Sequence, residues 1–453
     1  MKKLLVVAAF LCLFASSAIV LSQKRPPAQK KSSPAAPHAL ISVKATGTSR
    51  YTDKEILAAS GLQLGKDAAD ADFQEAAQRL GQSGLFSDVV YTFTYFDQGA
   101  KVEFQLTDNP AIKLLPVNFE NLVWFTDAEL LPVLEQRVPL FQHSLLPASS
   151  HLPDEVNAAL QALLREKHLP GRVDYLRQSK EQGGDLIGIE YRVEDIRIRI
   201  RNLEFPGASP DQAAFLEKAA HTLQYSEYLR SKLATVAQYD FLPLYLERGY
   251  LKASFAASEA RVVNASESAA SATKDEASPA EIDVDAIVPV TPGNVYAVSG
   301  LTWKGNSAIK IEEAAALLHL AQGHPADAIR LGKDVESLTR LYHTRGYMTA
   351  NITPEPHLDD AASAVQYTIN IVEGELYRMG ELEILGVDSA SRDRLQAAWH
   401  LREGDPYNPD YVKTFEDEAP RFLPRGLQYS TNVNQQLDAK NKVVDVTIRF
   451  ITH

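Results

Sequence analysis

Apolar residues follow two different spacings along this chain. Before Gly84 and before Gly346 they recur at i, i+3 and i+7, which predicts amphipathic helices. Residues 365–372 and 443–450 instead alternate between apolar and polar, which predicts strands with one buried face. Residues 89–95 and 101–106 alternate in the same way around a turn at 97–99, which predicts a β-hairpin. The chain therefore combines helices with strands.

Parts of the sequence repeat. Residues 51–57 and 125–131 both consist of an aromatic residue, Thr, Asp, any residue, Glu, an aliphatic residue and Leu. In each segment the Thr and the Glu three residues later form a capping box, in which the hydroxyl accepts a bond from the first helical turn and the carboxylate bonds back. Thr52 and Thr126 are therefore predicted to begin helices.

Glycines mark two further repeats. Gly65, Gly323 and Gly404 each end the pattern Leu-x-x-Gly, which suits the positive φ that follows a short helix. A second set ends a helical pattern and opens a strand, and its members are Gly84, Gly249, Gly346 and Gly426.

These signals recur in the order strand, helix, helix, strand, strand. They predict an α+β fold built as a tandem array of five units. The predicted bounds are 39–109, 110–195, 196–292, 293–375 and 376–453.

The second and third units follow the pattern least well. In the second, Leu169-Pro170-Gly171 replaces the Gly-aromatic pair, and Asn121 stands where the first strand of other units ends in Gly. In the third, Pro243 interrupts the second helical pattern. Residues 256–281 are rich in Ala, Ser and Glu, which predicts a disordered insert.

The fourth unit carries the full set of motifs: Trp303-Lys304-Gly305-Asn306, then Leu320 to Gly323, then Gly346-Tyr347, then Ile371-Val372-Glu373-Gly374. In this order the motifs resemble POTRA domains, the soluble repeats of BamA-type outer-membrane protein assembly factors. The resemblance implies that each β-α-α-β-β unit is a three-stranded mixed sheet with two helices on one face. Proteins of that type normally continue into a membrane β-barrel, whereas this chain stops at His453. We therefore expect no barrel here and carry over no membrane-insertion activity.

The N-terminus has the features of an export signal. Lys2 and Lys3 precede an uncharged apolar run at 4–20, and small residues lie at its end. We predict a signal peptide at 1–22, a flexible tether at 23–38, and a location in the periplasm or on the periplasmic face of the outer membrane. An uncleaved membrane anchor is the alternative, because about 18 apolar residues suffice to span a bilayer.

The composition and the motifs of the chain exclude several classes of function. The net charge of -12 repels phosphate backbones, so no nucleic-acid partner is expected. Cys12, the only cysteine, lies inside the apolar run, and the 11 histidines are scattered without metal-binding spacing. No nucleophile motif or phosphate-binding glycine loop occurs. The sequence therefore predicts no catalytic site, metal, cofactor or small-molecule substrate, and an enzyme with an unrecognised site is the remote alternative.

Sheet edges are the remaining candidates for binding. The resemblance implies that the strand after the second helix is a free edge, and unpaired N–H and C=O groups at an edge can accept an extended peptide as an added strand. The candidate ranges are 89–93, 250–255 and 347–353, with Pro354 expected to end the last. The candidate protein-binding residues are Val89, Tyr91, Phe93, Tyr250, Lys252, Tyr347, Thr349, Asn351 and Thr353. The alternatives are that neighbouring elements block these edges or that the edges are simply solvated, and that Tyr250 and Tyr347 anchor the core.

Together these features predict a non-enzymatic periplasmic scaffold. It would bind extended protein segments by strand addition in outer-membrane protein assembly or transport. The expected partners are an outer-membrane β-barrel protein or the assembly machinery, and unfolded client proteins. The alternative is a structural envelope scaffold or spacer that binds no nascent client.

Overall fold

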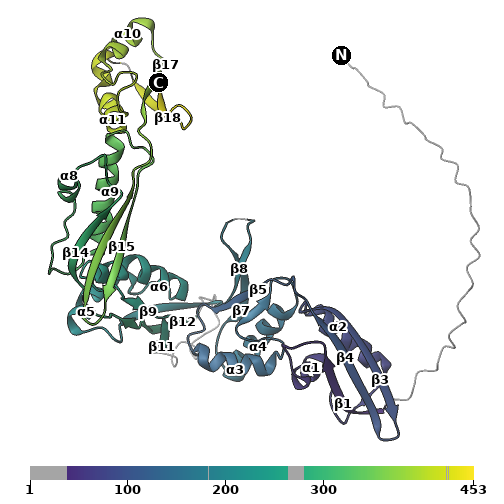
Figure 1. Ribbon diagram of the computed structural model, residues 1–453. Helices are drawn as coiled ribbons and strands as arrows, with labels where there is room; N and C mark the ends of the chain where they lie inside the picture. Colours follow the sequence, from purple (N-terminus) through teal and green to yellow (C-terminus); the bar gives the residue numbers. More distant parts are fainter. Residues whose placement is uncertain (1–37, 182, 264–279, 425, 427, 453) are drawn as a thin grey trace, which may run out of the picture. The chain divides into compact units, whose positions relative to one another are not determined.

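The computed structural model describes residues 38–181, 183–263, 280–424, 426 and 428–452. The predicted signal peptide, the tether up to residue 37 and the centre of the predicted insert lie outside the described residues. The chain divides into two compact units, Met1–Lys113 with Pro147–Leu152, and Leu114–Leu146 with Pro153–His453. Both units combine helices with sheets of parallel and antiparallel strands, which confirms the α+β class (Figure 1).

The first sheet has the strand order β2-β1-β4-β3, so it has four strands and not the expected three, because the short β2 pairs with the outer side of β1. Its elements in chain order are β1 (His38–Thr46), α1 (Asp53–Ser60), β2 (Asp67–Ala68), α2 (Asp70–Gln82), β3 (Phe86–Phe96) and β4 (Gly99–Asp108). β1 and β4 are parallel, whereas β3 and β4 form the predicted antiparallel hairpin. The central strand β4 buries Val102, Phe104 and Leu106 and exposes the residues between them, so one face of the sheet is covered.

Two local sequence predictions are confirmed in detail. The Thr52 hydroxyl accepts a bond from the Glu55 N–H at 3.3 Å, and the Glu55 carboxylate accepts one from the Thr52 N–H at 2.7 Å. Thr126 and Glu129 form the same capping box at the start of α3 (Asp127–Arg137). His38, placed in the tether by composition, is instead the first residue of β1.

The second sheet has the order β6-β5-β8-β7. Its strands and helices are β5 (Leu114–Phe119), α3, β6 (Leu145–Pro147), α4 (Leu152–Glu166), β7 (Arg172–Ser179) and β8 (Leu186–Glu194). After β5, the buried Asn121 side chain donates to the Val193 carbonyl at 3.0 Å and accepts from the Val193 N–H at 2.7 Å. This side chain pairs with the backbone of β8 as another peptide group would, which explains an Asn where other units have Gly.

The third sheet has the order β11-β12-β9, beside a two-stranded pair β10-β13. Its elements are β9 (Ile196–Glu204), α5 (Pro210–Ala220), η1 (His221–Leu223), α6 (Arg230–Val236), the π-helix η2 (Ala237–Phe241), α7 (Leu242–Leu246), β10 (Ser254–Phe255), β11 (Glu259–Val262), β12 (Ala280–Ile287) and β13 (Val290–Thr291).

Two predictions for this region are wrong. Pro243 does not interrupt the helix, because the wider π turn before it carries the helix on, with the Leu242 N–H bonded to the Ala237 carbonyl. The predicted disordered insert also begins too early. Residues 259–262 form β11, paired antiparallel with β12, and alternate apolar residues of β11 pack on the core.

The fourth sheet, β14-β16-β15, and the fifth, β17-β19-β18, share one arrangement. In each, the first and last strands in the chain are parallel and the outer strand is antiparallel to the last. The elements are β14 (Ala297–Lys304), α8 (Ile311–Ala315), α9 (Ala328–Thr344), β15 (Asn351–Asp359), β16 (Ala364–Val372), β17 (Arg378–Leu385), α10 (Ser389–Ala398), α11 (Pro409–Glu418), η3 (Ala419–Phe422), β18 (Tyr429–Asp438) and β19 (Val443–Thr452). As predicted, α9 buries Leu338 and Tyr342.

The position after β17 requires a glycine for steric reasons. Gly386 has φ +81°, and a Cβ added there would lie 1.9 Å from the Phe450 carbonyl oxygen of β19. Only a residue without a side chain allows the two backbones to approach this closely.

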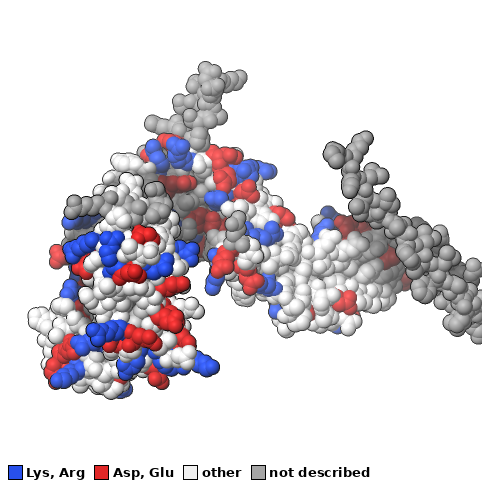
Figure 2. Space-filling model, turned by 90° about the horizontal axis from the view of Figure 1, so that it is seen from above, with Lys and Arg blue, Asp and Glu red and all other residues white. Residues whose placement is uncertain are grey.

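Charged side chains cover part of the face drawn in Figure 2, and another part of that face shows few of them. Basic and acidic side chains lie next to one another in the charged part, and neither sign forms a large continuous area among the described residues.

Candidate protein-binding sheet edges

The loop between the two helices covers one edge of several sheets. In the fourth sheet, the Gly323 N–H donates to the Val298 carbonyl of β14 at 2.8 Å, and the Val298 N–H donates to the His324 carbonyl at 2.9 Å. The same pair of bonds joins β1 to the loop at Leu40, Gly65 and Lys66, and β17 to the loop at Met379, Gly404 and Asp405. The Leu-x-x-Gly repeat therefore marks the point where a loop pairs with the first strand and closes its outer side.

The third sheet closes the same edge without glycine. Tyr225 has φ +62°, donates its N–H to the Ile200 carbonyl at 2.7 Å, and the Ile200 N–H donates to the Ser226 carbonyl at 2.9 Å. A tyrosine with positive φ is strained, and its bonds to β9 hold it there. The opposite edges are formed by β3, β7, β11, β15 and β18 in the five sheets.

The backbone of β3 faces outward at alternate residues. A two-residue turn joins β3 to β4, so Phe96 and Gly99 are the hydrogen-bonded closing pair of this hairpin. Such pairs alternate along an antiparallel ladder, so the even-numbered residues of β3 bond to β4 and the odd-numbered ones point away. Val89, Tyr91 and Phe93, which the sequence singled out, therefore direct N–H and C=O groups to the outer side of the first sheet.

Several of the β3 residues whose backbone groups face outward also have aromatic side chains, and these rings form a row on the helix side of the sheet. The Phe93 ring lies 5.3 Å from the Phe73 ring of α2 and 5.1 Å from the Tyr95 ring, measured between centroids. The Tyr91 hydroxyl donates to the Asp70 carboxylate at 3.0 Å. Burial, and then this hydrogen bond, raise the pKa of Tyr91. Tyr95 continues the same alternation, although it is not among the candidate residues predicted from the sequence.

The candidate residues near the fourth sheet are placed only partly as predicted. Tyr347 and Thr349 lie in the turn before β15, and the Tyr347 ring packs edge-on against Tyr342 at 6.1 Å, as a core anchor does. Asn351 and Thr353 do lie on the outer strand, because β15 begins at Asn351. Pro354 does not end this strand, which continues to Asp359.

Tyr250 and Lys252 do not lie on an edge strand. Both are in the turn that follows α7, and the segment then forms β10, which pairs with β13. The Tyr250 ring packs against Tyr245 with 5.4 Å between centroids. The Lys252 ammonium is held by the Asp360 carboxylate at 2.6 Å. The outer strand of the third sheet is β11 instead, which sequence analysis had placed in the disordered insert.

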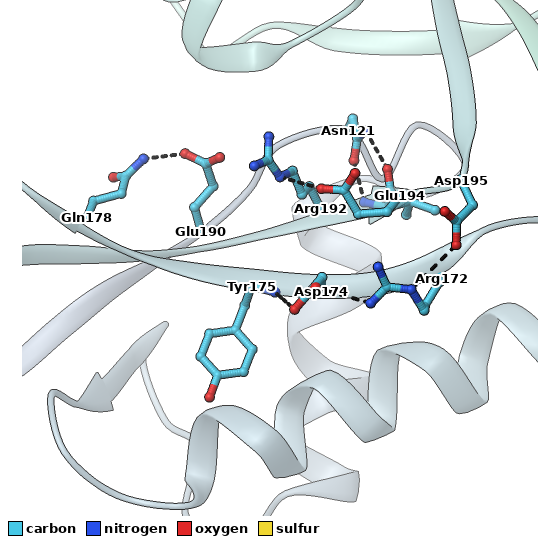
Figure 3. Close-up of polar contacts among 10 residues, drawn as sticks. Asn121, Arg172, Asp174, Tyr175, Gln178, Glu190, Arg192, Glu194 and Asp195 are labelled. Carbon is cyan, nitrogen blue, oxygen red and sulfur yellow. Dashed lines mark hydrogen bonds and ion pairs between the residues drawn. The ribbon is translucent and has the colours of Figure 1, made fainter. Parts of the chain in front are cut away.

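The second sheet has an outer strand that the sequence did not reveal. β7 lacks the glycine-aromatic start that marked the other candidate edges. On the face away from the helix, Gln178 donates to Glu190, and Arg192 pairs with Glu194 at 2.7 Å, while Tyr175 points to the helix side (Figure 3). The polar and charged side chains drawn on this face therefore pair with one another.

The outer face of the third sheet is a ladder of ion pairs. The Asp285 carboxylate is buried and accepts two bonds from the Arg201 guanidinium, at 2.8 and 2.9 Å, and one from Arg261 at 3.2 Å. Burial alone would raise the pKa of Asp285, but the bonds from Arg201 and Arg261 outweigh it and hold that pKa below its ordinary value. Asp285 is therefore ionised and paired at neutral pH.

Two kinds of feature are absent from the described ranges. None of their helices has both the length and the apolar character to span a membrane. Among the same residues, no three His, Cys, Asp or Glu side chains lie close enough to hold a metal ion.

Known proteins with similar sequences agree with the motifs. Residues 296–374 match the family described as POTRA, surface antigen variable number repeat. Over 430 residues, 90% of this chain and 52% of the relative, the sequence is 20% identical to the outer membrane protein assembly factor BamA of Neorickettsia risticii. Over 119 residues, 26% of this chain and 14% of the relative, it is 24% identical to a putative outer membrane protein assembly factor of Treponema pallidum. The chain thus spans about half the length of the first relative.

Among solved structures, POTRA domains 3–5 of Haemophilus influenzae BamA are 17% identical, with a TM-score of 0.39 over 56% of this chain and 95% of that chain. The N-terminal domain of Omp85 from Thermosynechococcus elongatus is 14% identical, with a TM-score of 0.24 over 57% of this chain and 98% of that one. The resemblance to POTRA-domain proteins of the BamA type, predicted from the motifs, is confirmed by the family match at 296–374, where those motifs are complete.

Proposed function

We propose that this chain is a non-enzymatic periplasmic scaffold that binds extended segments of unfolded client proteins by strand addition. Its role is in the assembly or transport of outer-membrane proteins, beside an outer-membrane β-barrel protein or the assembly machinery. The similarity to two outer membrane protein assembly factors supports this role. The chain is taken as five POTRA-like units with the bounds 39–109, 110–195, 196–292, 293–375 and 376–453, exported by the signal peptide at 1–22.

The geometry of β3 supports the mode of binding best. It is an outer strand of 11 residues without proline. Val89, Tyr91, Phe93 and Tyr95 direct N–H and C=O groups outward, and a peptide can bond to each of them in turn.

Backbone bonding alone does not make this binding strong. Each hydrogen bond contributes about 0.5–1.5 kcal/mol net, whereas ordering each peptide residue costs about 1–2 kcal/mol. Two bonds at every second residue give about 1–3 kcal/mol per two residues, which falls short of the about 2–4 kcal/mol that ordering those two residues costs. Contacts with the aromatic row of Tyr91, Phe93 and Tyr95 supply the remainder, so clients with apolar side chains at alternate positions bind best.

Disulfide trapping tests this proposal. In the full chain with Cys12→Ser, Thr92→Cys places a thiol on β3, and a ten-residue peptide of alternating Val and Thr carries one cysteine. An added strand lies about 5 Å from Thr92 and about 10 Å from Glu103, the partner of Thr92 on β4. A disulfide needs Cα atoms within about 7 Å, so the Thr92→Cys chain is trapped and a matched Glu103→Cys control is not.

The position of the peptide cysteine distinguishes an added strand from loose contact. Moving that cysteine along the peptide gives trapping that rises and falls with a period of two residues, because successive side chains point to opposite faces. Equal trapping of the Thr92→Cys and Glu103→Cys chains, or trapping without periodicity, contradicts strand addition at β3. Absent trapping of the Thr92→Cys chain favours a spacer that binds no client.

A further inference from the structure

The outer strand of the fourth sheet contains two prolines. β15 runs from Asn351 to Asp359 and pairs with β16 without a break. Pro354 lies opposite Ile369, and Pro356 lies opposite Tyr367. Prolines are tolerated within sheets mainly on edge strands, where the missing N–H would face away from the neighbour.

The register decides which way these two positions face. In an antiparallel ladder, a residue directs both backbone groups at its partner or both away, and the two kinds alternate. Proline has no N–H, and the ladder continues through both prolines, so the even-numbered residues of β15 face outward. Asn351 and Thr353 therefore bond to β16, whereas Ile352, Pro354, Pro356 and Leu358 form the outer side.

Four residues of β15 face outward, and two neighbouring ones among them, Pro354 and Pro356, have no backbone N–H to donate. A strand added there loses two hydrogen bonds, which weakens its binding by about 5- to 150-fold. The ring carbons of Pro354 and Pro356 also occupy the space where the N–H groups of another residue would meet a carbonyl. The outward residues of β3, by comparison, retain every donor.

We infer that Pro354 and Pro356 are specificity-determining residues, which close the fourth sheet to strand addition and restrict extended clients to other edges, β3 foremost. This inference rests on the proposed function, because it specifies which edge a client selects. The prolines leave the bonds between β15 and β16 intact, so closure of the outer side costs the sheet none of its own ladder.

Opening the edge tests the inference. Pro354→Thr with Pro356→Thr restores both donors with a residue that favours strands. Glu355→Cys, placed in the full chain with Cys12→Ser, provides a thiol on β15 that corresponds to the thiol of Thr92→Cys on β3. The probe is the same cysteine-containing peptide of Val and Thr. With the prolines present, the Glu355→Cys chain is trapped at least about fivefold more slowly than the Thr92→Cys chain, and the double substitution removes most of this difference.

Two results overturn the inference when the Thr92→Cys chain is trapped normally. One is equally fast trapping of the Glu355→Cys chain with the prolines present. The other is unchanged slow trapping after the double substitution, with hydrogen exchange showing that β16 keeps its protected amides.

Failure of the proposed function is recognised separately, by absent trapping of the Thr92→Cys chain. Whether the outer edge of β15 is closed is then measured without a client, by sedimentation of the chain with and without the double substitution. An opened edge pairs between two copies and yields dimers at high concentration. Identical sedimentation of the two chains overturns the inference.

Discussion

Adjacent valines on β3 provide a matched test of its register. Val89 and Val90 differ by one position, so the geometry directs the Val89 N–H outward and the Val90 N–H at Gln105 of β4. Proline at either position removes one donor and fixes φ. We predict that Val89→Pro impairs client binding with little loss of stability, whereas Val90→Pro destabilises the first sheet.

The expected changes in stability and affinity follow from the acceptor that each backbone N–H would lose. Val90→Pro removes a ladder bond, so it lowers the free energy of opening the first sheet by about 1–3 kcal/mol. Val89→Pro removes no ladder bond and exchanges one half-buried apolar side chain for another, so its cost stays below about 1 kcal/mol. Client affinity falls about 2- to 13-fold in Val89→Pro for the one donor lost to the added strand.

The assay must report on the first sheet alone. The chain has two compact units, so its global unfolding is not a two-state transition. Native-state hydrogen exchange at the amides of β4 measures the local opening free energy, and fluorescence anisotropy of a labelled Val-Thr peptide measures affinity. Equal destabilisation by the two substitutions would refute the assigned register. Unchanged affinity in a folded Val89→Pro chain would refute strand addition at this part of β3.

Two further substitutions test the packing of the third and fifth sheets. Asp285→Asn lowers the local opening free energy of the third sheet by about 1–3 kcal/mol at pH 7, measured by hydrogen exchange at β12. The folded pKa of Asp285 is depressed, so its contribution is present above the unfolded pKa of about 3.9 and is lost as the pH falls through the folded pKa. A deficit in Asp285→Asn that does not shrink as the pH is lowered below about 3.9 would contradict this. Gly386→Ala destabilises the fifth sheet by more than about 2 kcal/mol, because its Cβ would meet the Phe450 carbonyl, whereas Gly404→Ala, with a similar φ and open space, costs about 1 kcal/mol. Equal effects of the two alanines in exchange at β19 would show that the backbone contact is not the cause.

Local signals predicted local structure well. The Thr52 and Thr126 capping boxes and the β3–β4 hairpin depend on residues close together in the sequence, and all three formed as expected. The Leu-x-x-Gly repeats are evident in the sequence, but their pairing with the first strand of the sheet is not. The bonds of Gly323 to Val298 join residues that are far apart in the chain, and no local pattern contains them.

The candidate binding residues were hardest to place where a turn replaced a strand. Tyr347 and Tyr250 follow a helix-ending glycine, and the pattern did not distinguish a strand that begins at once from a turn that comes first. Both segments turn, because the tyrosine N–H bonds back to the last helical turn, to Tyr342 and Tyr245. The aromatic side chain then packs on the helix it has just left, and the strand begins only after it.

The two prolines of β15 show what additional information the sequence contained. The prediction that Pro354 ends the strand rests on proline's missing donor, yet in a hairpin only every second residue needs that donor for its own ladder. Pro354 and Pro356 are two apart and so share one orientation, and residues 365–372 were already predicted to be a neighbouring strand. A continuous hairpin tolerates both prolines when their missing N–H groups would face away from the neighbouring strand. Their spacing of two therefore predicts a longer strand, whose outer edge lacks donors for an added strand. By the same criterion we expect β3, whose outward positions hold valine and aromatic residues, to stay open to an added strand.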